Sequence, residues 1–182
     1  MNFRNLLLGA AVATAAMSLG AAANATAPNT QTATVTGAAK IIRPITISAT
    51  GTLDFGTIVK PRTGGTNGVV TISNAVTAAR TMTGDLVAVG STFSRPVYTI
   101  GGEGGQTYNL TVPASFTLTG PASSTITVTL NPSMTVGTNT FSGATLGNGD
   151  TATLYMGASI PVADTTTTGA YTGTYDVTVT YN

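Results

Sequence analysis

The sequence contains no cysteine, no histidine and no tryptophan. Without cysteine, the chain forms no disulfide and offers neither a thiol nucleophile nor a thiolate metal ligand. Without histidine, the nucleophile–base pairs of most hydrolases and the common zinc sites are excluded. We therefore expect a protein that is not an enzyme and that holds neither a metal nor another cofactor.

Charge is also scarce, because only 7% of the residues are charged and the formal net charge is +1. Nucleic acids and anionic membrane surfaces are bound by clustered Lys and Arg, so we expect neither as a partner, and no small-molecule substrate. The acidic residues occur singly, at predicted turns and outward strand positions. Two carboxylates could still meet in space as a catalytic pair. A solvated position is favoured for each of Asp54, Asp85, Glu103, Asp150, Asp164 and Asp176.

Two glycine-containing motifs resemble ligand loops without meeting their requirements. Asn148-Gly-Asp150 resembles part of a calcium loop but lacks regularly spaced carboxylates, so we interpret it as a hairpin turn. The run from Gly101 to Gly105 precedes a predicted strand, so it offers no helix N-terminus to a phosphate. Six tyrosines would allow carbohydrate stacking, but three of them lie on the final predicted strand, where packing is the better explanation.

Long apolar runs are missing except near the N-terminus, where residues 1–25 have the features of a signal peptide. Arg4 provides a positive charge, residues 6–17 are apolar, and Ala23-Asn24-Ala25 is a cleavage site of the A-x-A type. We expect cleavage before Thr26 and export through the periplasm to the cell surface or the medium. An uncleaved membrane anchor is the alternative, which the short, alanine-rich stretch disfavours.

Threonine, alanine and glycine are abundant instead, in short segments whose apolar and polar residues alternate with a period of two. Such segments predict β-strands, and their regular spacing between turn residues predicts one antiparallel β-sandwich. Residues 75–80 could form one helical turn, although they have no apolar period. Strands are expected at 45–47, 51–58, 69–73, 85–89, 96–100, 106–112, 125–130, 151–162 and 171–181.

The chain ends on the segment with the strictest alternation, Gly169–Asn182. Odd positions from Tyr171 to Tyr181 are Tyr, Gly or Val, whereas the even positions between them are Thr or Asp. This pattern predicts a turn at Gly169 and then a strand with one buried and one exposed face. A closed sandwich would normally add an edge strand beyond such a core strand, and none follows Asn182.

A second alternating segment, residues 32–42, precedes the first predicted core strand. Val35, Gly37, Ala39 and Ile41 share one face, opposite threonines and a lysine. A glycine inside a strand weakens it and usually marks the close approach of another backbone or side chain. We therefore expect an N-terminal arm over residues 26–41, followed by a folded domain over residues 42–182.

Two motifs of the mature chain carry a family resemblance. Asp54-Phe-Gly56 follows a hydrophobic first strand, and the pattern Gly-x-Tyr-x-Gly-x-Tyr-x-Val-x-Val-x-Tyr extends from Gly169 to Tyr181. With these motifs the chain resembles the spore coat protein U family of secreted bacterial pilins, in a cysteine-free and uncharacterised branch. More broadly, it is similar to chaperone–usher pilus subunits. Many such pilins carry a disulfide between early strands, which this chain lacks.

The resemblance implies an all-β fold, an incomplete immunoglobulin-like antiparallel sandwich that lacks its last strand. It also implies a structural subunit of a surface pilus, which polymerises with itself by donor-strand exchange after secretion by a periplasmic chaperone and an outer-membrane usher. The donor strand would contain Val35, Gly37, Ala39 and Ile41. The acceptor groove and the chaperone-facing final strand would involve Gly169, Tyr175, Val177, Val179 and Tyr181.

A self-contained sandwich is the alternative hypothesis. Such a protein would be a secreted surface or carbohydrate-binding protein whose arm pairs within its own domain. The alternation of the arm around a central Gly37 favours the fibre subunit.

Overall fold

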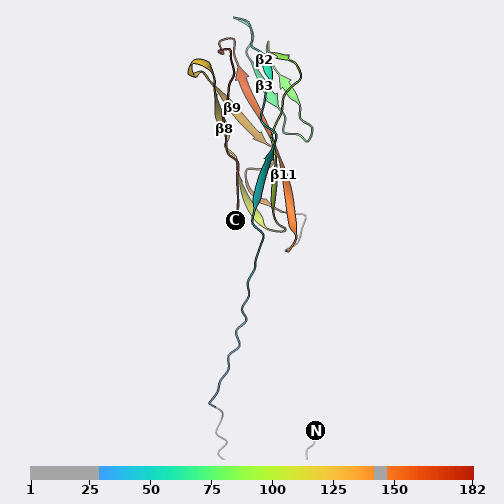
Figure 1. Cartoon of the computed structure of the whole chain (residues 1–182), viewed down its shortest axis with the longest axis vertical. Helices are drawn as coiled ribbons and strands as arrows, with labels where there is room; N and C mark the ends of the chain where they lie inside the picture. Colours follow the sequence, from blue (N-terminus) through green and yellow to red (C-terminus); the bar gives the residue numbers. More distant parts are fainter. Residues whose placement is uncertain (1–28, 142–146) are drawn as a thin grey trace, which may run out of the picture. The chain divides into compact units, whose positions relative to one another are not determined.

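The computed structural model describes residues 29–141 and 147–182 (Figure 1). The chain divides into two units, of which the first ends at Ala39 and the second comprises Lys40–Asn182. The predicted signal peptide over residues 1–25, its cleavage site and the mature N-terminus at Thr26 lie outside the described residues.

Residues 29–39 have no regular secondary structure and their side chains are exposed, with Val35 retaining 88% of its accessible surface. The alternation over residues 32–42 therefore does not produce a strand in the single chain, contrary to the sequence pattern. A strand needs a neighbouring backbone to satisfy its amide and carbonyl groups, and the pattern alone does not provide one. The donor-strand role of this segment stays a prediction.

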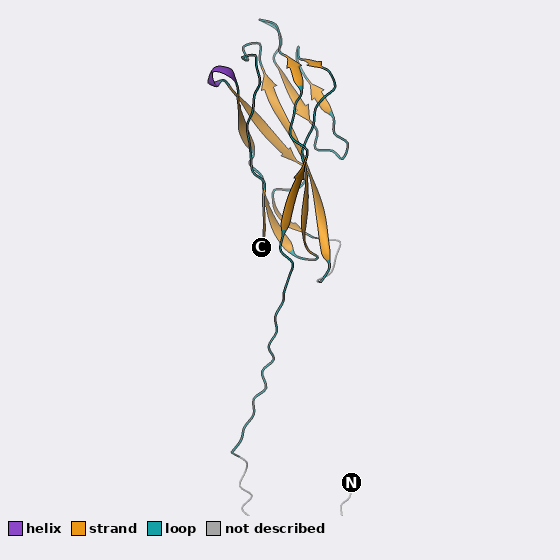
Figure 2. Ribbon diagram, in the orientation of Figure 1, coloured by secondary structure: helices purple, strands orange, loops and turns teal. Residues whose placement is uncertain are grey.

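The second unit is an antiparallel all-β sandwich, as the sequence predicts (Figure 2). Within the described residues its largest sheet has seven strands. These are β1 (Thr46–Thr50), β3 (Gly68–Ile72), β4 (Arg80–Met82), β6 (Val97–Glu103), β8 (Ser115–Thr119), β9 (Thr125–Pro132) and β11 (Gly149–Val162). The order is β1-β6-β11-β3-β4, with β9 also pairing β11 and β8 pairing β9. β11 is central, because its first half pairs with β6 and its second half with β3 and β9.

Two smaller sheets complete the second unit. One is ordered β10-β7-β12 and the other pairs β2 with β5. A 3₁₀ turn separates β8 from β9. In the part of the chain that the structure describes, no helix is long and apolar enough to cross a membrane. The bounds are β2 (Thr57–Val59), β5 (Val87–Val89), β7 (Thr107–Thr111), β10 (Gly137–Thr140), β12 (Thr178–Tyr181) and η1 (Pro121–Ser123) for the turn.

The inward faces predicted from alternation are confirmed. In β7, Tyr108 and Leu110 are fully buried, whereas Thr107 and Thr111 are exposed. β9 and β11 alternate in the same way, and Val128 and Leu154 from these strands have no exposed surface. These side chains meet between the sheets because successive residues of a strand point to opposite faces.

Several element boundaries differ from the sequence prediction. Residues 75–80 form bends and then enter β4 instead of a helical turn, because they present no apolar stripe to pack against the sheet. The predicted strand 51–58 is reduced to a single bridge at Asp54 followed by β2. The predicted strand 171–181 is reduced to β12, with one bridge at Thr172. The sequence pattern also missed β4, β8 and β10.

The second unit has two ends that are defined by the course of β11. We call the end beside Gly149 the root end, because Arg43, which follows the arm, packs there. The end beside Val162 is the tip end, where Gly68 pairs with Val162 and where β2 and β5 lie (Figure 1). The fourteen residues of β11 span thirteen steps of about 3.3 Å, which places the two ends about 43 Å apart.

Candidate functional site: an apolar groove

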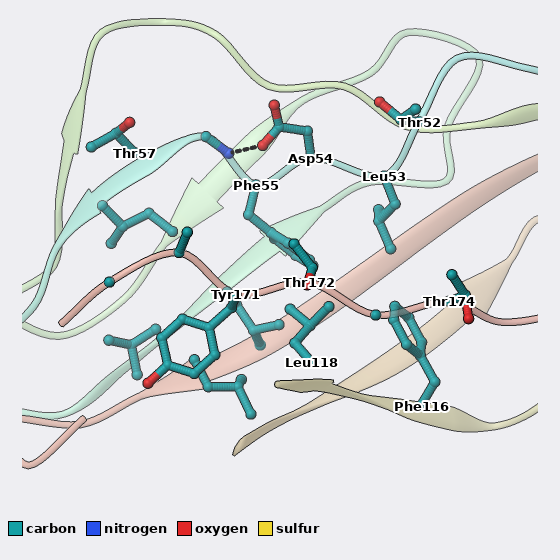
Figure 3. A pocket seen from close by; sticks show the side chains of 18 of the residues that line it. Thr52, Leu53, Asp54, Phe55, Thr57, Phe116, Leu118, Tyr171, Thr172 and Thr174 are labelled. Carbon is teal, nitrogen blue, oxygen red and sulfur yellow. Dashed lines mark hydrogen bonds between the residues drawn. The ribbon is translucent and has the colours of Figure 1, made fainter. Parts of the chain in front are cut away.

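A groove of about 980 Å³ runs along one side of the second unit (Figure 3). Its first rim is the segment 49–60, which leaves β1, and its second rim is the segment 166–175, which leads to β12. Apolar side chains of the sheets lie at its base. They are Phe116, Leu118, Ile126, Ile160 and Val162.

The first rim is shaped by Asp54-Phe-Gly56, the motif that carries part of the family resemblance. Asp54 forms a bridge with Ser94, and its carboxylate accepts a hydrogen bond of 2.8 Å from the Gly56 N–H. Gly56 has a φ of +76°, and a Cβ atom there would overlap the carbonyl oxygen of Thr92. Only glycine tolerates both conditions without strain. The motif therefore turns the chain between β1 and β2 and keeps Phe55 buried in the core.

The second rim lies against the edge of β8. Thr172 and Thr119 exchange two backbone hydrogen bonds of 2.8 and 3.0 Å. Gly173 packs on the carbonyl group of Thr117, and Gly169, with a φ of +147°, packs on the Pro121 ring, so a Cβ atom at either glycine would overlap its neighbour. The two glycines of the closing pattern therefore permit the close approach of this rim to β8 and to the turn that follows it.

Side chains link the chain segments that form the rims. At the tip end, the Lys60 ammonium donates hydrogen bonds of 2.7 and 2.8 Å to the carbonyl oxygens of Asp164 and Thr166, which ties the two rims. Beyond the rims, at the root end, the Tyr181 hydroxyl donates a bond of 3.0 Å to the Arg43 carbonyl oxygen.

Between these ties the rims pair with other elements and not with each other. The first rim pairs through β1 with β6 and through Asp54 with Ser94, while the second pairs through Thr172 with β8. In residues 29–141 and 147–182, no backbone pairing crosses the groove from one rim to the other. Each rim therefore has backbone groups beside the groove that could bind an added strand.

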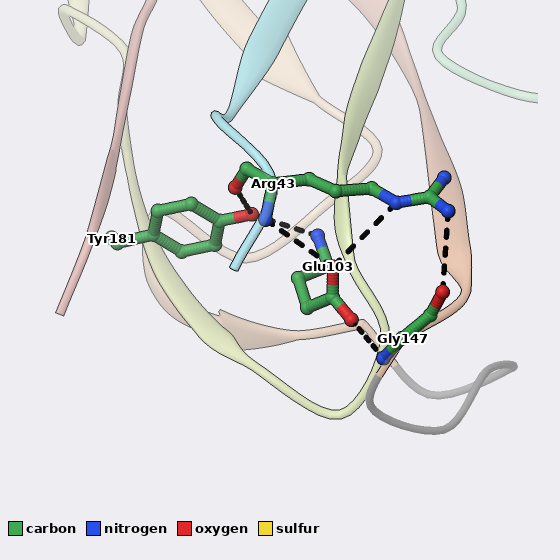
Figure 4. Close-up of polar contacts among 4 residues, drawn as sticks. All are labelled: Arg43, Glu103, Gly147 and Tyr181. Carbon is green, nitrogen blue, oxygen red and sulfur yellow. Dashed lines mark hydrogen bonds and ion pairs between the residues drawn. The ribbon is translucent and has the colours of Figure 1, made fainter. Parts of the chain in front are cut away.

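The Tyr181 tie belongs to a polar cluster at the root end (Figure 4). Glu103 is 1% exposed, and its carboxylate accepts hydrogen bonds from the backbone N–H groups of Arg43 (3.3 Å) and Gly147. The Arg43 guanidinium lies 3.7 Å from the same carboxylate and donates a bond of 3.2 Å to the Gly147 carbonyl oxygen. The Glu103 N–H in turn donates a bond of 2.7 Å to the Tyr181 hydroxyl.

The cluster corrects the prediction that Glu103 is solvated. A buried carboxylate is tolerated when charges and hydrogen-bond donors surround it, as they do here. These partners come from three distant parts of the sequence, so the local glycine-rich context of Glu103 gave no signal of its burial.

Aromatic residues lie at the base of the groove. The Tyr175 ring lies 4.8 Å from the Phe116 ring, and the Tyr175 and Tyr98 hydroxyls are 3.2 Å apart. Burial, reinforced by the Tyr98 hydroxyl, raises the pKa of Tyr175 well above its ordinary value. The raised pKa reports how far this hydroxyl is removed from water.

The structure divides the predicted acceptor residues into two groups. Gly169 and Tyr175 line the groove. Val177, Val179 and Tyr181 continue along the same segment towards the root end, where they are partly buried against the core.

The predicted donor residues precede the first strand of the sandwich. Val35, Gly37 and Ala39 belong to the exposed N-terminal unit, and Ile41, at the start of the second unit, is 92% exposed. Among the described residues, no group of three or more acidic side chains is placed to hold a metal ion.

Together, the fold and the groove define a small antiparallel β-sandwich with an open apolar groove between two chain segments. Residues 45–181 match the family described as Domain of unknown function (DUF4402), and the chain belongs to that family. The matched region contains both rims and the whole sandwich, and it begins just before β1. Neither the curated proteins nor the solved structures include a match to this chain.

Proposed function

We propose that the protein is a structural subunit of a surface fibre, in which the N-terminal arm of one copy fills the apolar groove of the next. The observation that carries the proposal is an apolar groove between two chain segments that make no backbone pairing with each other in the described residues. A strand inserted there would gain main-chain hydrogen bonds on both sides and would place alternate side chains in the groove.

The arm has the composition that such a groove requires. Its apolar residues alternate, so Val35, Gly37, Ala39 and Ile41 would all point into the groove when the segment is extended. Burying Val35 and Ile41 would contribute about 3 to 6 kcal/mol, at about 1.5 to 3 kcal/mol for each aliphatic side chain. Both side chains are almost fully exposed in the single chain, so this contribution is still to be gained.

The route to the surface is part of the same proposal. The signal-peptide pattern over residues 1–25 supports export through the periplasm. A subunit with an open apolar groove would aggregate if it were left uncovered, which supports the need for a periplasmic chaperone and an outer-membrane usher. No catalytic activity and no cofactor are proposed.

The first prediction tests the insertion with two leucine substitutions in the arm. Gly37→Leu should prevent polymerisation, because a large side chain facing the base of the groove would clash. No other atom lies within 4 Å of a Cβ placed on Gly37 in the single chain, so the subunit itself should fold. Thr36→Leu is the matched control, since residue 36 would face away from the groove.

The measurement is a denaturing gel of unheated and heated fibres, beside size-exclusion profiles of both variants. Equal polymerisation of Gly37→Leu and the parent would overturn the proposal. A parent chain that stays a monomer with its arm paired to its own sheet would favour the self-contained sandwich instead.

A further inference from the structure

The tip end carries an apolar patch that the groove does not explain. Val59, Val87 and Val89 are 49%, 58% and 55% exposed, and they lie on the outer face of the two-stranded sheet formed by β2 and β5. Val59 pairs directly with Val87, and Val89 pairs with Thr57, so the three valines are neighbours on one face. We call these three side chains the tip patch. Val59 also lines the groove, so the patch continues one rim of the groove.

A second exposed apolar site lies at the root end. Ile41 is 92% exposed and Ile42 is 37% exposed, just before the Arg43 side chain that packs beside Gly149. The arm thus starts from the end of β11 that is opposite to the tip patch. If Ile41 points into the groove of a neighbour, then Ile42 points to the outer face of the same sheet, because successive strand residues alternate.

The direction in which the arm enters the groove determines which end of the acceptor lies against the root end of the donor. The folded domain of the donor could lie at the acceptor's root end or at the acceptor's tip end. In the first case two root ends face each other, and the acceptor's own arm starts from the same crowded place. In the second case the root end of one copy meets the tip end of the next, and each copy keeps its own root end free to donate its arm. This heterologous contact can repeat from copy to copy along a filament.

We propose that the tip patch is the docking surface for the root end of a second copy of this chain, with Ile42 of that copy lying against Val59 and Val87. The proposal rests on the fibre function proposed above. It assigns the occupant from two observations: the patch adjoins the groove, and the residues that follow the arm pack at the opposite end. An arm inserted with Ile41 towards the groove would place Ile42 on the outer face, beside β2. The contact would fix the angle between successive subunits, in addition to the flexible link that the arm provides.

Cysteine cross-linking provides the test, because the chain has no cysteine of its own. Fibres are collected from cells that produce the full chain with Ile42→Cys and Val87→Cys, and are treated with a short bismaleimide cross-linker. The matched control combines Ile42→Cys with Val76→Cys. Val76 is 77% exposed but lies in the loop that follows Ile72, at the end of β3 away from the tip. The single variants complete the set.

The expected result is a covalent ladder of trimers and larger species in heated samples of the patch pair. The control pair and the single variants should give dimers at most. A companion variant, Val87→Asp, should lower the fraction of subunits in long fibres by roughly tenfold, which corresponds to about 1.4 kcal/mol per contact. Val76→Asp should leave that fraction unchanged.

Two different results would overturn the inference, and they are distinguishable from each other. If unheated samples contain polymers, but the patch pair cross-links no better than the control pair, the docking surface is wrong and the fibre function stands. If the parent gives no polymers at all, the fibre function fails and the docking surface fails with it.

Discussion

At the scale of single residues, two tyrosines that are paired across β7 and β12 use their hydroxyl groups in opposite ways. Tyr181 is the register partner of Tyr108. The Tyr181 hydroxyl donates to Arg43 and accepts from the Glu103 N–H, which links the C-terminal strand to the start of the domain. The Tyr108 ring packs 4.5 Å from Phe141, but its buried hydroxyl has no hydrogen-bond partner among the described residues.

The same substitution should therefore have different effects at these two positions. Tyr181→Phe removes two hydrogen bonds and leaves the Glu103 N–H without its acceptor, so we expect a loss of about 1 to 3 kcal/mol in the free energy of unfolding. Tyr108→Phe removes an unsatisfied buried hydroxyl, and should be neutral or slightly stabilising. Urea unfolding of the full mature chain measures both. Equal losses would mean that the root-end cluster does not hold the strand.

A second residue-scale prediction concerns Lys60, which ties the rims at the tip end. Lys60→Met keeps most of the aliphatic stem but removes two hydrogen bonds to the second rim. We expect the amides of Ala163, Asp164 and Thr166 to exchange hydrogen about tenfold faster, because a partly buried charge-assisted bond contributes at least about 1.4 kcal/mol.

Two controls accompany the Lys60 measurement. Arg62→Met changes an exposed cation in the same loop and should leave those amides unaffected. The Thr172 amide, which is bonded to Thr119, should also keep its protection in Lys60→Met. Faster exchange along the whole rim would instead indicate general destabilisation, and the local role of Lys60 would be wrong.

At the scale of elements, residues 171–182 keep the alternating burial that is typical of a strand, even where they form no sheet hydrogen bonds. Tyr175, Val177, Val179 and Tyr181 are partly buried, whereas every even position from 172 to 182 is exposed. The extended backbone, and not the sheet hydrogen bonds, produces this alternation. The segment can therefore face the core with one side and still leave its backbone edge unpaired beside the groove.

Aspartate substitutions on the two faces should separate these roles. Val177→Asp or Val179→Asp would bury an unpaired charge against the core, and should cost about 2 kcal/mol or more. Thr178→Asp lies on the exposed face and should cost less than about 1 kcal/mol. The yield of folded protein and its denaturant midpoint provide the comparison. Equal losses of stability at all three positions would mean that the buried and exposed faces of this segment are assigned wrongly.

The sequence predicts the parts of this fold that depend on local periodicity. A period of two places Leu110, Val128 and Leu154 in the core without knowledge of their partners, because alternation is a property of each strand alone. The family resemblance implied an acceptor groove at Gly169 and Tyr175. Both residues line a groove in the structure, and its role as an acceptor stays a prediction. The burial of Glu103 and the Lys60 tie were not predictable, since each depends on groups that are distant in the sequence.

At the scale of the whole molecule, the protein combines an exposed apolar arm with an apolar groove on a nearly uncharged surface. Only 7% of the residues are charged, so association between copies meets little electrostatic repulsion. Polymerisation through the groove should consequently depend weakly on salt, unlike contacts made by charged side chains. The proposed fibre would also have a direction, because the copy that donates an arm and the copy that accepts one would use different parts of the chain.

This direction predicts how an incomplete copy should affect fibres of complete ones. A chain that lacks residues 26–40 keeps both rims and the base of the groove, but it has no arm to donate. When it is produced together with the full chain, it should accept an arm and then stop growth, so that mean fibre length falls as its proportion rises. Gly37→Leu should act in the same way, since it also accepts without donating. Electron microscopy of fibres at several mixing ratios measures the effect. If each arm pairs with its own sheet, complete copies form no fibres and offer no arm to the shortened chain, so no fibres should appear at any ratio.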